Sequence, residues 1–96
     1  MTPEALVQDK IKKWLEANDI LFFRRQAGGG NSYRTGIPDL YGVHLGLHFE
    51  IETKSEDGKL SSAQYKWRKT LLKHGSIYIS PKSFEEFLIE WKKYFN

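Results

Sequence analysis

The segment from Leu47 to Lys54 constrains the fold most strongly, because apolar and polar side chains alternate along it with a period of two. This period is that of a β-strand with two different faces. One face carries Leu47, Phe49, Ile51 and Thr53, and the other carries His48, Glu50, Glu52 and Lys54. The pattern therefore predicts a strand that has Glu52-Thr53-Lys54 at its end.

The other segments predict the element order α-β-β-β-α-β-α. Thr2 and Pro3 form a helix start, Gly75 ends a helix, and Ser83 with Glu86 forms a capping box. The predicted helices span about 3–18, 62–74 and the segment after Ser83, and the predicted strands span 20–25, 39–44, 47–54 and 76–80. Leu45-Gly46 is the predicted turn between two of these strands. The fold class is α/β (α+β), with a mixed sheet flanked by helices.

The size and composition predict one domain over residues 1–96. Of the 96 residues, 40% are hydrophobic, and six Phe, five Tyr and three Trp supply a core. The chain has no cysteine, which excludes disulfides and cysteine-bound zinc and suits a cytoplasmic location. No apolar run has the length of a membrane span, and we expect no secretion signal.

Basic residues are concentrated in one part of the chain. The net charge is only +3, but the segment from Lys59 to Phe84 contains no acid. Its six basic residues are Lys59, Lys66, Arg68, Lys69, Lys73 and Lys82. A long basic segment is typical of a solvated helix face and of a phosphate-binding surface, and both interpretations remain open.

Four polar features are difficult to explain by folding alone. Glu4 falls within the apolar stripe of the first helix, although an acid in a first turn is also favoured by the helix dipole. Asp39 follows Gly36-Ile37-Pro38, which by itself indicates only a turn. Glu52 and Lys54 share a strand face, as a surface ion pair would. Gln64 forms a capping box with Ser61, and capping is compatible with a role in a site.

These residues together predict a metal site. Asp39 begins one strand and Glu52 ends its hairpin partner, so the two carboxylates can lie side by side. Two such charges at about 4 Å repel by roughly 4 kcal/mol, and Glu4 would add to this repulsion. A divalent cation relieves it, and oxygen ligands favour Mg²⁺ or Mn²⁺. His44, His48 and His74 show no metal-binding spacing.

The sequence resembles the virus-type replication-repair nuclease (VRR-NUC) domain, a branch of the PD-(D/E)XK nuclease superfamily. The resemblance covers nearly the whole chain. It rests on Gly-Ile-Pro-Asp at 36–39, Glu-Thr-Lys at 52–54 and Gly-Lys-Leu-Ser-Ser-Ala-Gln at 58–64. It also includes Glu4 and Gln8 in the first helix and Arg24 before Gln26-Ala27-Gly28. It implies a restriction-endonuclease-like mixed sheet.

The resemblance also implies the roles of individual residues. It gives Asp39, Glu52, Lys54 and Gln64 as catalytic residues. It gives Glu4, Asp39, Glu52 and Thr53 as metal ligands for Mg²⁺ or Mn²⁺. Thr53 stands where Val is more common, and it would bind through its backbone carbonyl. The DNA-binding candidates are Arg24, Arg25, Arg34, Lys59, Lys66, Arg68, Lys69 and Lys73.

The function implied is metal-dependent cleavage of DNA chosen by its shape, as in a Holliday-junction resolvase of DNA repair, with no small-molecule substrate. Standalone members are, by resemblance, homodimers that cut four-way junctions. Leu6 and the aromatic segment 91–95 are candidates for a dimer interface, although Trp91 and Phe95 would also serve to cover the sheet. The alternatives are a flap or single-strand nuclease, a non-catalytic nucleic-acid-binding module, and a protein-interaction domain.

Overall fold

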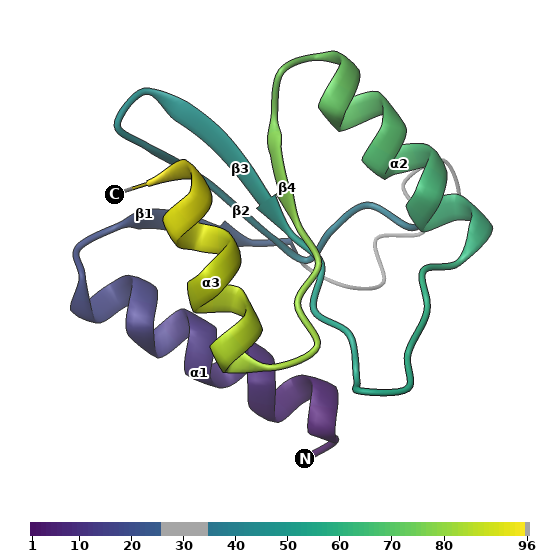
Figure 1. The fold of residues 1–96 in the computed structure, drawn as a ribbon, viewed down its shortest axis with the longest axis horizontal. Coiled ribbons are helices and arrows are strands. Elements are labelled where there is room, and N and C mark those ends of the chain that lie inside the picture. Colours follow the sequence, from purple (N-terminus) through teal and green to yellow (C-terminus); the bar gives the residue numbers. More distant parts are fainter. Residues whose placement is uncertain (26–34, 96) are drawn as a thin grey trace.

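The computed structural model describes residues 1–25 and 35–95 and has the predicted element order (Figure 1). The elements are α1 (Pro3–Ala17), β1 (Leu21–Arg24), β2 (Leu40–His44), β3 (Leu47–Ile51), α2 (Ser62–Lys73), β4 (Ile77–Ile79) and α3 (Phe84–Tyr94). Most predicted ends were correct to within one residue. The exception is β3, which ends at Ile51 and not at Lys54.

The four strands form one mixed sheet in the order β1-β2-β3-β4. The first three strands are antiparallel, and β4 runs parallel to β3 after the crossover through α2. The predicted turn at Leu45-Gly46 is confirmed, with φ values of 51° and 80° at the two positions. Two successive positive φ angles are typical of a tight hairpin turn.

Beyond Ile51 the chain keeps only part of its strand pairing. The Glu52 N–H donates to the Ile79 carbonyl at 2.9 Å, and the Lys54 N–H donates to the Pro81 carbonyl at 3.0 Å. Proline has no N–H with which to return a bond, so the regular ladder cannot continue along Pro81. Residues 52–54 are therefore held beside the end of β4 although β3 itself has ended.

Helices α1 and α3 cover one face of the sheet, here called the first face, and enclose the core (Figure 1). The opposite face is called the second face. Ile11 and Leu15 from α1 and Phe87 from α3 are fully buried with Phe49 and Ile51 of β3. The edge of the Trp14 ring meets the Phe87 ring, with centroids 5.5 Å apart.

The C-terminal aromatic residues are divided between the core and the surface. Trp91 and Phe95 are buried against Phe49, so these two residues cover the sheet and do not form an exposed interface. Tyr94 remains exposed, and so does Leu6 on α1. Of the two roles left open for Trp91 and Phe95, the structure shows that of covering the sheet, and the homodimer stays a prediction. Within the part of the chain that the structure describes, no helix has the length and apolar character needed to cross a membrane.

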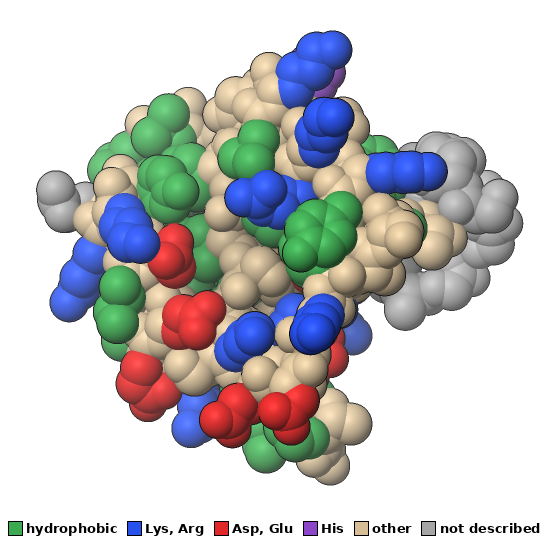
Figure 2. Space-filling view, turned by 45° about the vertical axis from the view of Figure 1, so that its right-hand side comes forward, with side chains coloured by type: hydrophobic (Ala, Val, Ile, Leu, Met, Phe, Trp, Pro, Cys, Tyr) green, Lys and Arg blue, Asp and Glu red, His purple; other side chains and the backbone are tan. Residues whose placement is uncertain are grey.

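Among the described elements, α2 covers the second face of the sheet, and it does so beside β4. The pairs Tyr41↔Glu50 and Glu50↔Tyr78 place these three side chains on one face, opposite to that of Ile51 and Ile79. The guanidinium of Arg68 on α2 lies 5.9 Å from the centre of the Tyr78 ring. Figure 2 shows Lys and Arg side chains gathered at the upper right over α2, and Asp and Glu side chains mainly in the lower part.

Candidate active site

The strand register places Asp39 directly opposite Glu52. The last regular pair between β2 and β3 is Leu40↔Ile51, and Asp39 and Glu52 follow one residue further out. The Asp39 carbonyl accepts from the Arg25 N–H at 2.7 Å, so the chain at Asp39 still runs alongside β1. Opposite residues of an antiparallel pair project to the same face. The two acids therefore lie side by side on the second face, as predicted.

Gly36 allows the turn before Asp39 to pack tightly against α2. It has a φ of 88°, a conformation that side chains other than glycine disfavour. A Cβ atom here would lie 2.5 Å from the Ala63 carbonyl carbon and 2.7 Å from the Gln64 nitrogen. The Trp67 indole N–H also donates to the Thr35 carbonyl at 3.1 Å. These contacts fix the start of α2 beside the Asp39 turn.

We expect Gly36→Ala to destabilise the fold by about 2 kcal/mol or more, because it combines left-handed strain with a backbone clash. Urea unfolding measures this loss. Gly46→Ala is a matched control, since Gly46 has a similar φ of 80° but no atom within 4 Å of an added Cβ. Equal losses in the two variants would show that packing against α2 does not determine the need for glycine.

Glu52 is buried, with 4% of its surface exposed, and its carboxylate is held from α2. Gln64 donates from Nε2 to Glu52 Oε1 at 3.3 Å. The same carboxamide accepts from the Ser61 N–H through Oε1 at 2.7 Å, and the Ser61 hydroxyl accepts from the Gln64 N–H. The capping box therefore sets which end of the amide faces Glu52. Capping and contact with the site occur in one side chain.

The pKa of Glu52 is raised from the usual 4.5 to about 7, mainly by burial and also by the negative charges of Asp39 and Glu4. Lys54 and the hydrogen bond from Gln64 act in the opposite direction, but they do not cancel the cost of burial. The carboxyl group is thus poorly compensated when ionised. A perturbed carboxyl beside a second acid is typical of functional sites.

This pKa predicts how Glu52→Gln changes stability with pH when no metal is present. The folded-state pKa is above the usual 4.5, so the wild-type protein loses stability as pH rises from about 4.5 to about 7. The shift corresponds to about 3 kcal/mol. We expect Glu52→Gln to gain about this much relative to wild type above pH 7, and little below pH 4.5. Urea unfolding in EDTA at several pH values measures the difference in unfolding free energy between Glu52→Gln and wild type. A difference that is independent of pH would contradict the raised pKa of Glu52.

The remaining predicted acids and amides approach from α1. Gln8 donates from Nε2 to Asp39 Oδ2 at 3.4 Å, and Glu4 lies one turn earlier on the same helix. Glu4 is close enough to act on Glu52 through its charge. However, no three His, Cys, Asp or Glu side chains within residues 1–25 and 35–95 are arranged to hold a metal ion. Glu4 therefore contributes negative charge without forming a ready-made three-acid site.

Thr53 is the third residue to which the resemblance gives a metal-binding role, through its backbone carbonyl. The N–H groups of Glu52 and Lys54 both point towards the end of β4. Because successive peptide groups of a strand alternate in direction, the Thr53 carbonyl points the other way, towards the chain at Asp39. The Thr53 side chain is buried, as predicted. Two carboxylates and a carbonyl form an all-oxygen donor set that suits Mg²⁺ or Mn²⁺.

The predicted DNA-binding residues other than Arg25 and Arg34 are all exposed, on α2 or elsewhere. Lys66, Lys69 and Lys73 are exposed and follow one stripe of α2 at helical spacing, whereas Arg68 projects from the other side over Tyr78. Arg24 and Lys59 are exposed at separate positions. Arg34 lies outside the described residues.

Arg25 takes part in a buried network that the sequence analysis missed. Its guanidinium donates to the two oxygens of Glu50 at 2.5 and 3.0 Å and to the Pro38 carbonyl at 2.7 Å. His48 Nε2 contacts the other side of the carboxylate, at 2.6 Å from Oε2. The position of Glu50 on the same strand face as Glu52 was visible in the sequence. Its partner was not, because Arg25 is distant along the chain.

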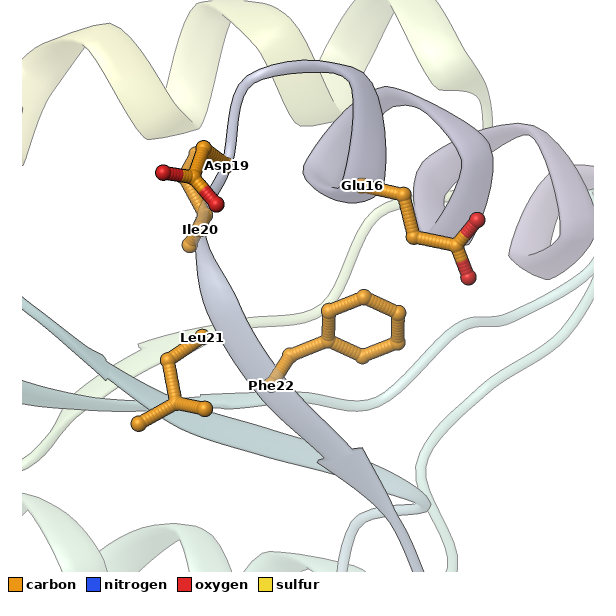
Figure 3. Close-up of a pocket in the computed structure, with 5 residues that line it drawn as sticks. All are labelled: Glu16, Asp19, Ile20, Leu21 and Phe22. Atoms are coloured by element: carbon orange, nitrogen blue, oxygen red, sulfur yellow. The ribbon is translucent and has the colours of Figure 1, made fainter.

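A separate pocket of about 350 Å³ lies at the junction of α1 and β1 (Figure 3). Its lining residues are Glu16, Asp19, Ile20, Leu21 and Phe22. The pocket is at the start of β1, whereas the acid pair lies beyond the end of this strand. None of the predicted site residues lines it.

Comparison with solved structures identifies the same type of domain. One, named "VRR_NUC domain", is 26% identical and superposes with a TM-score of 0.78, with 100% of both chains covered. A second, named "VRR_NUC domain protein", is 17% identical with a TM-score of 0.76, covering 99% of this chain and 89% of the other. No model of a protein family and no curated protein matched. The resemblance indicated by the motifs is confirmed by the fold, and the chain has the architecture of a VRR-NUC domain, a nuclease-type domain.

Proposed function

We propose that this chain is a divalent-metal-dependent endonuclease that hydrolyses phosphodiester bonds in branched DNA. The observation that carries the proposal is Glu52, a buried carboxyl with a pKa of about 7 that lies beside Asp39 and is hydrogen-bonded by Gln64. Such a group is costly to the fold, and within residues 1–25 and 35–95 the charge of Lys54 and the hydrogen bond from Gln64 offset this cost only in part. A bound cation would offset it.

The donor set fits Mg²⁺ or Mn²⁺. Asp39, Glu52 and the Thr53 carbonyl would hold the ion, and Glu4 would add negative charge nearby. A cation bound there would polarise a scissile phosphate and make a nearby water more acidic. A small number of protein ligands would suit an ion that usually keeps several waters.

Lys54 would act on the attacking water and on the phosphate. It lies two residues from Glu52, on the same side of the extended chain, and it is close enough to lower the pKa of Glu52. Its ammonium group would orient the water and offset the negative charge that develops on the phosphate. Gln64 would keep the Glu52 carboxylate in position during the reaction.

The outer side of α2, opposite to Gln64 and Arg68, would bind the sugar-phosphate backbone. The exposed stripe of Lys66, Lys69 and Lys73 runs along α2, whose first turn contributes Gln64 to the site. Lysine contacts of this kind position DNA without reading its sequence. We therefore propose selection by DNA shape. A homodimer would supply the two active sites that paired cuts in a four-way junction require.

A panel of labelled DNA structures tests this proposal. We expect cleavage with Mg²⁺ or Mn²⁺ and none with EDTA, and we expect a four-way junction to be cut faster than the linear duplex of the same sequence. Faster cutting of a flap or a single strand would support the alternative nuclease class. Tight DNA binding with no cleavage in either metal would support the non-catalytic module and would overturn the proposal.

A further inference from the structure

The second face of the sheet continues past the acid pair into an open apolar surface over β1 and β2. The pairs Leu21↔Val43 and Phe23↔Tyr41 place these four side chains on that face. Leu21, Phe23 and Val43 are exposed, and Phe23 retains 49% of its surface. Helix α2 lies on the same face but beside β4, two strands from β2.

Three aromatic rings cross this surface from strand to strand. The Phe23 and Tyr41 rings have centroids 5.5 Å apart and planes inclined by 30°. The Tyr41 and His48 rings have centroids 6.2 Å apart and planes inclined by 29°. Phe23, Tyr41 and His48 thus form a row of nearly parallel rings, here called the ring row. Its two end members, Phe23 and His48, are the exposed ones.

The ring row is held in place by the buried Glu50 network. The Arg25 guanidinium lies 4.2 Å from the centre of the Tyr41 ring. It also donates hydrogen bonds to both carboxylate oxygens of Glu50. Glu50 is only 1% exposed, and it also fixes His48 through Nε2. Rings that are already oriented lose little conformational freedom when a flat ligand stacks on them.

We propose that the ring row binds unpaired bases of the DNA strand that is cleaved, with Phe23 as the outermost stacking residue. The inference rests on the proposed nuclease function. Tyr41 lies two residues from Asp39 along β2, and Glu50 lies two residues from Glu52 along β3. Tyr41 and its cross-strand neighbour Phe23 are therefore about 7 Å along the strands from the acid pair and on the same face, and His48, four residues from Glu52, is about 13 Å away. A DNA strand with its phosphate at the acids reaches the row with a neighbouring nucleotide.

The combination of rings and positive charge favours a base over an apolar protein surface as the occupant. Proteins that bind single strands combine aromatic stacking residues with a basic surface that follows the backbone. Here Arg68 of α2 lies over Tyr78, which is on the same sheet face as Tyr41. The surface is also continuous with the proposed catalytic acids.

Fluorescence measurements with Ca²⁺ in place of Mg²⁺ test the proposal without requiring cleavage. The probes are a flap DNA with 2-aminopurine at an unpaired position beside the junction, and the linear duplex of the same length. We expect wild-type protein to quench the unpaired 2-aminopurine. We expect Phe23→Ala to bind the flap about 10-fold more weakly and to lose the quenching, with duplex binding unchanged. Phe23→Trp should restore both.

Leu45→Ala is the control, because Leu45 is an exposed apolar residue at the distant turn. Circular dichroism confirms folding, and light scattering reports the oligomeric state. Unchanged flap binding in Phe23→Ala would overturn the proposal. An equal loss for flap and duplex together with conversion of a dimer to a monomer would also overturn it, and would assign the face to a second copy of the chain. Phe23-dependent quenching by a protein that cleaves no DNA with Mg²⁺ would support stacking while refuting the nuclease function.

Discussion

Asp39→Asn is expected to reduce DNA cleavage by more than about 100-fold, measured as a single-turnover rate with Mg²⁺. The substitution preserves the shape of the side chain. It removes one of the two carboxylates that lie side by side just beyond the last β2–β3 pair. Loss of residues that merely support metal ligands commonly costs 10-fold to 100-fold, so the loss of a ligand should cost at least as much. DNA binding should be equal or tighter, because a negative charge near the phosphate is removed.

Asp57→Asn is the matched control for this variant. Asp57 is an exposed acid in the turn that follows the site, and its removal changes the net charge by the same amount. Asp57→Asn should cleave at the wild-type rate. If Asp39→Asn also does so, Asp39 is only a turn residue and the metal assignment is wrong.

Lys54→Ala is expected to slow the chemical step by about 100-fold or more while Mn²⁺ still binds. A positioned group that assists proton transfer typically contributes a factor of 100 to 10,000. Lys54 also lowers the pKa of Glu52, so its removal makes Glu52 harder to ionise. Single-turnover kinetics and calorimetric Mn²⁺ titration should therefore both be carried out at about pH 8.5, where Glu52 is ionised in wild type.

Lys82→Ala controls for the loss of one positive charge, since Lys82 is exposed and outside the proposed site. We expect its cleavage rate to remain near that of wild type. A normal rate in Lys54→Ala would reduce Lys54 to an ion-pair partner of Glu52. Loss of Mn²⁺ binding at pH 8.5 would assign it a role in the shape of the metal site and not in the chemical step.

The sequence predicted the fold well where local signals act alone. The alternation from Leu47 to Ile51, the caps at Thr2 and Ser61, and the turn at Leu45-Gly46 each depend on a few adjacent residues. The end of β3 could not be predicted in this way. It depends on Pro81, which reaches the strand only after the crossover and offers no N–H there.

Part of the candidate site was also predictable. The hairpin register that brings Asp39 opposite Glu52 follows from the turn, and the contact of Gln64 with Glu52 follows from a capped helix that begins beside the strand end. The Arg25 and Glu50 pair was not predictable, because it depends on which of many charged side chains become buried together. The same limit applies to Glu4, whose distance from the acid pair is set by the packing of α1.

Calorimetric titration of the metal-free protein with Mn²⁺ near pH 7 tests most directly whether Glu52 and Asp39 form a metal site. Glu52 is partly protonated at this pH, so binding of the ion should release part of a proton, and metal ligation is in general coupled to such release. The measured heat should therefore change between two buffers with different ionisation enthalpies. Glu52→Gln should abolish both the binding and the buffer dependence. Saturable binding that persists unchanged in Glu52→Gln, or no binding at millimolar Mn²⁺ in wild type, would contradict the account.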